Sequence, residues 1–252
     1  MTRTPADFTA AFARCPLVAI LRGLTPGEAD EVGEALVEAG FGIVEVPLNS
    51  PQPYESIARL ARRLEGRALV GAGTVLFPNE VSAVAEAGGR LIVSPNTDTA
   101  VIAATVAAGL SSMPGYFTPS EALAAIQAGA HALKLFPAEA ASPAALRAQA
   151  AVLPPEIPIL AVGGIMPESL PGWIAAGASG FGIGSSIYTP GRDAAEVRRR
   201  AEAFVGAWQT GAANHRRSCR RQKRSGPGNG RKMASGSWPA PSAPARPWTC
   251  FE

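Results

Sequence analysis

Lys134 is the only lysine before Lys223, and apolar residues surround it in the segment Ala132 to Pro137. Burying an unpaired ammonium group costs so much free energy that a buried lysine tends to lose its proton. A neutral amine is a nucleophile, and a desolvated lysine can attack a carbonyl group to form a Schiff base. We therefore predict that Lys134 is a covalent catalyst, with a structural ion pair as the alternative interpretation.

Glu45 is a second ionisable side chain within an apolar run, Ile43 to Leu48. An ionised carboxylate is costly to bury, so burial should raise its pKa toward neutrality. A carboxyl group tuned in that way can move protons to and from the intermediates of Schiff-base chemistry. We predict that Glu45 is the acid/base partner of Lys134, and a buried ion pair between the two remains the alternative.

Eight short apolar runs alternate with longer Ala-, Glu- and Arg-rich stretches that have helical periodicity. The runs span residues 17–21, 43–48, 68–71, 91–93, 110–113, 132–136, 157–162 and 180–183. Eight strand and helix pairs within residues 1–208 predict a single-domain TIM (β/α)8 barrel. A doubly wound open sheet is the alternative, but no Gly-x-Gly-x-x-Gly motif follows the first run.

Local signals mark where the helices of this barrel begin and end. A Ser or Thr followed by Pro is typical of a helix start, as at Thr25, Ser50 and Thr118. Glu28 and Glu121 stand three residues after two of these positions and complete capping boxes. Ala-Gly pairs, in which glycine supplies a left-handed cap, predict the helix ends at residues 39–40, 87–88, 108–109, 128–129 and 176–177.

The carboxyl ends of barrel strands meet at one face, where the chemistry of this fold is concentrated. The last two strand ends carry Gly163-Gly164 and Gly184-Ser185. Backbone N–H groups in such loops can hold a phosphate, although strand-end glycines are also ordinary turn residues. Arg22, at the first strand end, is the predicted cation for a phosphate or carboxylate.

The charge of the chain is divided between two unlike regions. Residues 1–208 hold 14 Lys and Arg against 19 Asp and Glu, whereas residues 209–252 hold 9 against 1. The second region is rich in Arg, Ser, Gly and Pro without apolar periodicity, so we expect it to be a disordered basic tail. An arm that binds nucleic acid or an anionic surface is the alternative to a bland appendage, but we do not expect a nucleic-acid partner.

The cysteines and the apolar runs bear on the cellular compartment. Cys15, Cys219 and Cys250 are scattered and lack metal-ligand spacing, so we expect neither a metal site nor a disulfide framework. No uncharged apolar run is long enough to span a membrane, and the first residues lack a secretory signal pattern. We therefore expect a cytoplasmic protein with no membrane partner.

Taken together, the motifs resemble those of the 2-keto-3-deoxy-6-phosphogluconate and phosphogalactonate aldolases, class I enzymes of bacterial sugar-acid degradation. The resemblance covers about residues 10–208 and rests on segments 19–23, 44–51, 71–75, 94–95, 114–115, 133–137 and 162–165, in the family's order. It implies Schiff-base chemistry at Lys134, acid/base work at Glu45, and substrate contacts at Arg22 and Thr74. It also implies a homotrimer that needs no metal or other cofactor.

Two features resemble the phosphogalactonate branch of that family. Residues 47–51 read Pro-Leu-Asn-Ser-Pro, and Val162 precedes the double glycine where the gluconate enzymes tend to carry Thr. The two substrates differ only in configuration at C4, so a hydroxyl group there can hydrogen-bond one epimer, and Val162 is the predicted determinant of stereoselectivity. Tyr116 and Phe117 depart from the family pattern, and their rings could narrow the site.

The resulting hypothesis is reversible cleavage of a phosphorylated 2-keto-3-deoxy sugar acid, 2-dehydro-3-deoxy-6-phosphogalactonate, to pyruvate and glyceraldehyde 3-phosphate. Arg22, Thr74 and Pro95 would surround the substrate carboxylate and the bound sugar acid. A gluconate-specific or bifunctional aldolase is the runner-up. A phosphosugar isomerase on the same barrel, with Glu45 as a base and no covalent step, is the alternative from another class.

Overall fold

The computed structural model describes the backbone of residues 4–225 and the side chains of residues 4–218. Its strands are β1 (Leu17–Ile20), β2 (Ile43–Pro47), β3 (Leu69–Gly73), β4 (Leu91–Val93), β5 (Ser111–Met113), β6 (Gly115–Tyr116), β7 (Leu133–Leu135), β8 (Ile159–Val162) and β9 (Gly180–Ile183). Its α-helices are α1 (Ala6–Arg14), α2 (Pro26–Glu38), α3 (Pro53–Arg63), α4 (Pro78–Glu86), α5 (Thr99–Ala107), α6 (Pro119–Gln127), α7 (Pro143–Ala150), α8 (Leu170–Ala175) and α9 (Ala194–Ser225). Two short 3-10 helices, η1 (Ala138–Ala140) and η2 (Pro167–Ser169), complete the set.

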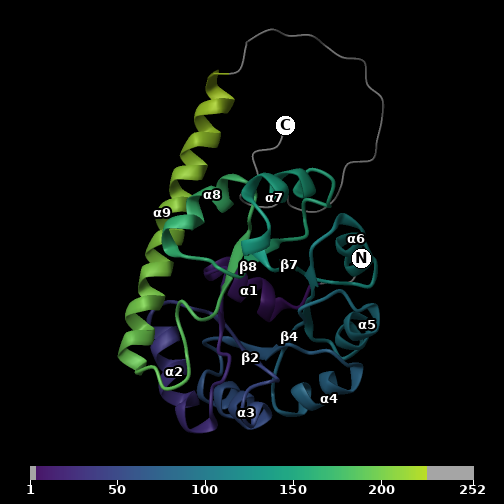
Figure 1. The fold of residues 1–252 in the computed structure, drawn as a ribbon, viewed down its shortest axis with the longest axis vertical. Coiled ribbons are helices and arrows are strands. Elements are labelled where there is room, and N and C mark those ends of the chain that lie inside the picture. The colour runs from purple at the N-terminus through teal and green to yellow at the C-terminus, as the bar shows by residue number, and fades with distance from the viewer. Residues whose placement is uncertain (1–3, 226–252) are drawn as a thin grey trace.

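All strand pairs are parallel, and the sheet runs in the order β5-β4-β3-β2-β1-β9-β8-β7-β6. Only Pro114 separates β5 from β6, so the two edges of the sheet belong to one bent strand. The Gly115 N–H donates to the Ser94 carbonyl at 3.0 Å, and the Lys134 N–H donates to the Pro114 carbonyl at 2.9 Å. These bonds close the sheet, and the ring of helices around it in Figure 1 makes a (β/α)8 barrel, as predicted.

The predicted strands and most predicted helix boundaries are confirmed. Each of the eight apolar runs contains a strand or, at residues 68–71, overlaps one, and the glycine of each predicted Ala-Gly helix end has a positive φ. The Glu121 carboxylate accepts from the Thr118 N–H at 2.7 Å, and the Glu28 carboxylate accepts from the Thr25 N–H at 3.2 Å. The start predicted at Ser50 is wrong, because α3 begins at Pro53 after Gln52, whose left-handed φ of 43° turns the chain into the helix.

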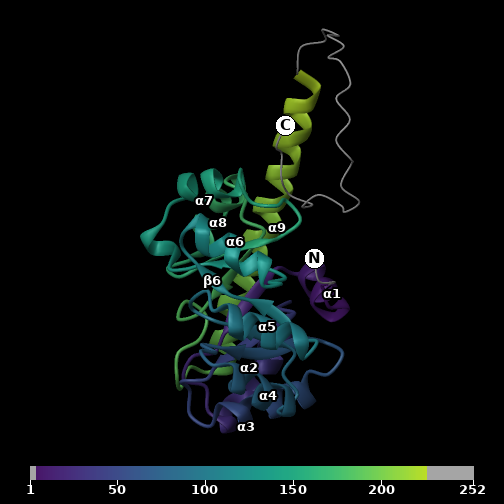
Figure 2. The same ribbon diagram turned by 90° about the vertical axis from the view of Figure 1, so that its right-hand side faces the viewer.

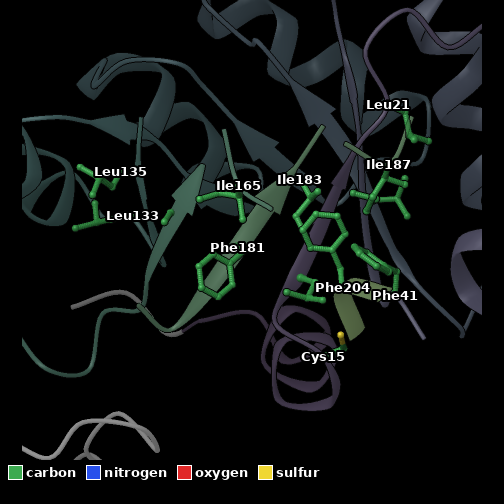
Figure 3. Packing of buried hydrophobic residues seen from close by; sticks show 14 of the residues in the cluster. Cys15, Leu21, Phe41, Leu133, Leu135, Ile165, Phe181, Ile183, Ile187 and Phe204 are labelled. Carbon is green, nitrogen blue, oxygen red and sulfur yellow. The ribbon is translucent and has the colours of Figure 1, made fainter. Parts of the chain in front are cut away.

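Two apolar layers hold the barrel. The outer layer lies between strands and helices, and Figure 3 shows Leu133 and Leu135 of β7 within it. The inner layer fills the barrel with inward-facing side chains of its strands, such as Val18 and Leu160, and it includes Phe8 of α1. Helix α1 precedes β1 and lies at the centre of the helix ring in Figure 1, so it plugs the amino-terminal end of the barrel. The opposite, carboxyl end is left for the site.

Helix α9 continues through the domain boundary expected at residue 208. Trp208 and Ala212 are buried, and a Cβ on Gly211 would stand 2.8 Å from Cδ1 of Ile174 in α8, so this part of the helix packs on the barrel. Figure 2 shows α9 extending past the other helices. The disorder expected from residue 209 therefore does not apply to residues 209–225, because packing against α8 lets the helix continue past the predicted boundary. The rest of the expected tail, residues 226–252, lies outside the described residues.

Two kinds of feature are missing from the described part of the chain. None of its helices is both long enough and apolar enough to cross a membrane. Within that same part, no group of three His, Cys, Asp or Glu side chains is arranged to hold a metal ion. Cys15 is a free, buried thiol in the outer apolar layer.

Candidate active site

Lys134 and Glu45 lie on β7 and β2 and point into the barrel. Their immediate neighbours along each strand pack into the outer apolar layer, and side chains alternate in direction along a strand. Only 6% of Lys134 and 2% of Glu45 is exposed to solvent. The charge of each residue shifts the pKa of the other. The two predicted catalytic groups therefore lie in one buried site.

The Glu45 carboxyl group occupies space that a glycine leaves open. A Cβ on Gly73 of the neighbouring strand would stand 2.8 Å from Cδ and Oε1 of Glu45 and 2.9 Å from Oε2. Oε2 has no hydrogen-bond partner within the described residues. Burial raises the pKa of Glu45, against the opposing charges of Lys134 and Arg22. The carboxyl group therefore holds its proton at a higher pH than an ordinary glutamate does, which suits it to proton exchange.

The Lys134 amine has the complementary tuning. Burial lowers its pKa, the charge of Glu45 opposes that shift, and the Arg22 guanidinium adds to it. Nζ stands 4.7 Å from the centroid of the Phe136 ring, which forms an apolar wall beside the amine. Both pKa shifts favour a neutral amine next to a neutral acid, the combination required for attack on a carbonyl group.

The β1–α2 loop positions Arg22 at the carboxyl end of the barrel. Nη1 of Arg22 donates to Oδ1 of Asn49 at 2.7 Å, and the Gly23 N–H donates to Oγ of Ser50 at 2.9 Å. Ser50 is buried and holds this loop instead of capping α3. Both anchors, Asn49 and Ser50, lie within the segment 44–51 that carries the family resemblance. Their spacing did not indicate that they hydrogen-bond the loop that carries Arg22.

Thr74, Pro95 and Val162 sit at the ends of β3, β4 and β8. Thr74 has a φ of 56°, a conformation that is rare for threonine and often marks a functional constraint. The carbonyl oxygen of Pro95 would stand only 2.2 Å from a Cβ on Gly115, so the β4 end passes close to β6. Val162 is buried in the inner apolar layer, with no hydroxyl group to offer a substrate.

The Tyr116 ring does not crowd this pocket. Tyr116 is 2% exposed and belongs to the outer apolar layer, so its ring lies between strand and helices. Phe117 is 40% exposed at the start of α6. The narrowing anticipated from the Tyr116 ring is not found, because the strand alternation turns this ring away from the interior.

The loops after β8 and β9 present open backbone donors. Gly163 and Gly164 have φ values of 108° and 63°, so these two successive residues both adopt positive φ. Within the described residues, the N–H groups of Gly164, Ser185 and Ser186 have no acceptor. Oγ of Ser186 donates to the Ile165 carbonyl at 3.0 Å and joins the two loops. Such a set of backbone donors can hold an anion.

Glu139 lies beside the β8 loop, although it is not among the site residues predicted from the sequence. A Cβ on Gly164 would stand 2.7 Å from Oε2 of Glu139, and one on Gly163 would stand 3.5 Å from it. The exposed carboxylate therefore lies against the double glycine. Its position two residues after Pro137, in the loop that follows the Lys134 strand, was the available signal.

The chain is similar in sequence and in fold to known aldolases. The family model described as "Aldolase: KDPG and KHG aldolase" matches residues 9–199. A "Probable 2-dehydro-3-deoxy-6-phosphogalactonate aldolase" of Rhizobium meliloti (strain 1021) is 49% identical over 193 residues, which is 77% of this chain and 91% of that protein. The 2-dehydro-3-deoxy-6-phosphogalactonate aldolase of Escherichia coli (strain K12) is 46% identical over 196 residues, 78% of this chain and 96% of that protein.

A solved structure gives the same similarity in three dimensions. The chain described as "Native KDPGal structure" superposes with a TM-score of 0.78 at 43% sequence identity. The superposition covers 84% of this chain and 100% of that chain.

Proposed function

Since the chain belongs to the KDPG and KHG aldolase family, we propose that it reversibly cleaves 2-dehydro-3-deoxy-6-phosphogalactonate to pyruvate and D-glyceraldehyde 3-phosphate. The observation that carries the reaction is a buried lysine next to a buried carboxyl group at the carboxyl end of the barrel. The substrate rests on the two relatives named for the galactonate compound and on Val162 before the double glycine.

In the proposed mechanism, the neutral Lys134 amine attacks the C2 ketone of the substrate. Glu45 moves a proton from nitrogen to oxygen in the adduct and then protonates the hydroxyl group, which leaves as water and gives a protonated imine. The resulting Glu45 carboxylate takes the proton of the C4 hydroxyl group as the C3–C4 bond breaks. The electron pair of that bond enters the imine, giving an enamine, and the aldehyde departs.

The second half of the cycle returns pyruvate. Glu45 delivers its proton to C3 of the enamine, which regenerates a protonated imine. Water then attacks C2, and Glu45 transfers the protons that expel the Lys134 amine. One carboxyl group can serve every step, because its raised pKa makes both protonation states accessible.

The surrounding residues receive binding roles in this proposal. Arg22 supplies the cation for the substrate carboxylate or phosphate, and Thr74 and Pro95 line the pyruvyl end. The donors of Gly163, Gly164, Gly184 and Ser185 take the phosphate. The two loops that carry these four residues are bridged by Ser186.

Borohydride trapping tests the covalent step. Reduction in the presence of pyruvate should fix a three-carbon adduct on Lys134, located by peptide mass spectrometry, and Lys134→Ala should give no adduct. An adduct on another residue would remove Lys134 from the mechanism. The absence of any adduct in the unsubstituted protein would instead favour a phosphosugar isomerase that uses Glu45 as a base.

The substrate is tested by kcat/KM for the two phosphorylated epimers, with lactate dehydrogenase reporting pyruvate release. We expect a strong preference for the galactonate compound. Comparable rates would identify a bifunctional aldolase, and a preference for the gluconate compound would overturn the substrate assignment. The family model spans the gluconate enzymes, which is why this comparison is needed.

We also propose that the protein is a cytoplasmic homotrimer. The family resemblance supports the trimer, and the scattered cysteines support a reducing compartment. Light scattering on the purified protein should give three times the 25.9 kDa mass of one chain. A monomer mass would contradict the trimer, and recovery of the protein in an exported or membrane fraction would contradict the location.

A further inference from the structure

The segment that follows β9, residues 184–188, is held by its carbonyl groups. Nη1 of Arg192 donates to the carbonyls of Ser185 at 3.1 Å and of Ile187 at 2.6 Å. Nη1 of Arg200 in α9 donates to the Ser186 carbonyl at 3.3 Å. The Gly184 carbonyl accepts from the N–H groups of Ile187 and Tyr188 at 2.9 and 3.0 Å. Consecutive carbonyls of this loop are therefore all occupied.

Fixing these carbonyls also fixes the direction of the free N–H groups. The C=O of one residue and the N–H of the next belong to one planar peptide and point in opposite directions. The Gly184 and Ser185 carbonyls turn toward the following residues and Arg192, so the N–H groups of Ser185 and Ser186 turn the other way. These are two of the unbonded donors at the anion-binding loops.

A second anchor holds the far end of the same loop. Oε1 of Glu28 accepts from Oη of Tyr188 at 3.2 Å and from the Gly191 N–H at 2.9 Å. A Cβ on Gly23 would stand 2.6 Å from Cγ of Pro190, so the loop also packs closely on the loop that carries Arg22. The loop is thus held to α2 through Glu28 and to α9 through Arg200.

We propose that Arg192, assisted by the Glu28–Tyr188 anchor, is a positioning residue for the phosphate of the substrate. It acts through the backbone, by holding the N–H groups of Ser185 and Ser186 in place before the phosphate arrives. This preorganisation saves the free energy of ordering the loop on binding. The inference rests on the proposed function, because it assigns the phosphate of that substrate to these donors.

The test compares Arg192→Met with a matched control, Arg199→Met. Arg199 is an arginine in the second turn of α9, close in sequence to Arg192, but its ion pair joins it to Glu196 of the same helix instead of to the loop. Each variant is assayed for aldol addition of pyruvate to D-glyceraldehyde 3-phosphate and to unphosphorylated D-glyceraldehyde. Arg192→Met should raise KM for the phosphorylated aldehyde by about 10-fold, with kcat within about twofold. The unphosphorylated aldehyde and the control should show no change.

Tyr188→Phe provides an independent variant, because it removes only the hydroxyl group that donates to Glu28. We expect the same selective rise in KM, by about threefold. If Arg192→Met fails to fold by circular dichroism, Tyr188→Phe decides the question. An unchanged KM in a folded variant, or equal losses with both aldehydes, would overturn the inference.

Trapping with pyruvate separates this inference from the proposed function. Pyruvate has no phosphate, so the borohydride adduct should form at the wild-type level in Arg192→Met. If the unsubstituted protein forms no adduct, the proposed function fails. If the adduct forms normally but the phosphorylated aldehyde binds Arg192→Met as tightly as wild type, only the role of Arg192 fails.

Discussion

The inner pair, Lys134 and Glu45, and the outer loops around Ser185 are held in different ways. Each residue of the inner pair sits on a strand that is hydrogen-bonded to its neighbours in the sheet. Both lie within a packed interior, where burial is the main cause of their pKa shifts. The outer loops project from strand ends and are held by Glu28 of α2, by Arg192 in the loop before α9 and by Arg200 of α9. In the proposed mechanism, the reactivity of the amine comes from its burial on a strand, whereas recognition of the distal end of the substrate comes from loops that need separate support.

The largest expected effect separates the acid/base group from the rest of the site. Glu45→Gln keeps the side-chain shape but cannot take up or release a carboxyl proton, so kcat should fall by about 10²-fold or more. KM should change much less, because the outer loops remain intact. Steady-state cleavage of the phosphogalactonate compound measures both. An unchanged kcat would assign proton transfer to another group and end the proposed pairing with Lys134.

Gly73→Ala attacks the same pair without altering an ionisable group. The new Cβ would meet three atoms of the Glu45 carboxyl group within 2.9 Å, so the carboxyl group must shift and kcat should fall by about 10-fold. Gly172→Ala is the matched control, since no atom lies within 4 Å of its added Cβ. A Gly73→Ala enzyme as fast as the control would show that the position of the carboxyl group is not critical.

Val162→Thr probes the boundary between the inner pair and the outer loops. A hydroxyl group here can hydrogen-bond the C4 hydroxyl of one epimer, so the ratio of kcat/KM values should shift by about 10-fold toward the gluconate compound. Both epimers are assayed side by side, with the pyruvate adduct on Lys134 as a check that the inner pair is intact. A ratio equal to wild type would remove Val162 as the determinant of stereoselectivity.

The smallest effect concerns stability and belongs to the inner pair alone. The pKa of Lys134 is lowered from its ordinary 10.5, so between the folded value and 10.5 only the unfolded state carries the extra proton. Stability therefore rises with pH across that window, by about 1 kcal/mol for each pH unit. Urea unfolding of wild type and Lys134→Met should show wild type gaining on the variant as pH rises. Parallel curves would mean that Lys134 titrates normally in the folded chain.

The sequence predicted the inner pair and the barrel well because both depend on local patterns. A lysine and a glutamate inside apolar runs can be recognised from neighbouring residues, and so can strands bounded by capped helices. Arg192 and Glu139 could not be identified in this way, because their partners lie in other loops or are backbone atoms. Ser50 carried a helix-start signal, but its hydroxyl group serves the preceding loop. The continuation of α9 past residue 208 depended on contacts with α8 that composition does not encode.

Because β1 pairs with β9, the buried environment of the Lys134 amine can form only after β9 has been translated. Leu17 pairs with Phe181 of the last strand, so the barrel cannot close on the ribosome until all of its strands have left the exit tunnel. Before closure, the Lys134 amine lacks the burial that lowers its pKa, and a solvated, protonated lysine is a poor nucleophile. The residues that fasten the last loop, Arg192 and Arg200, are translated later still. A nascent or truncated chain that lacks β9 therefore contains Lys134 and Glu45 without the buried site that the proposed reaction requires.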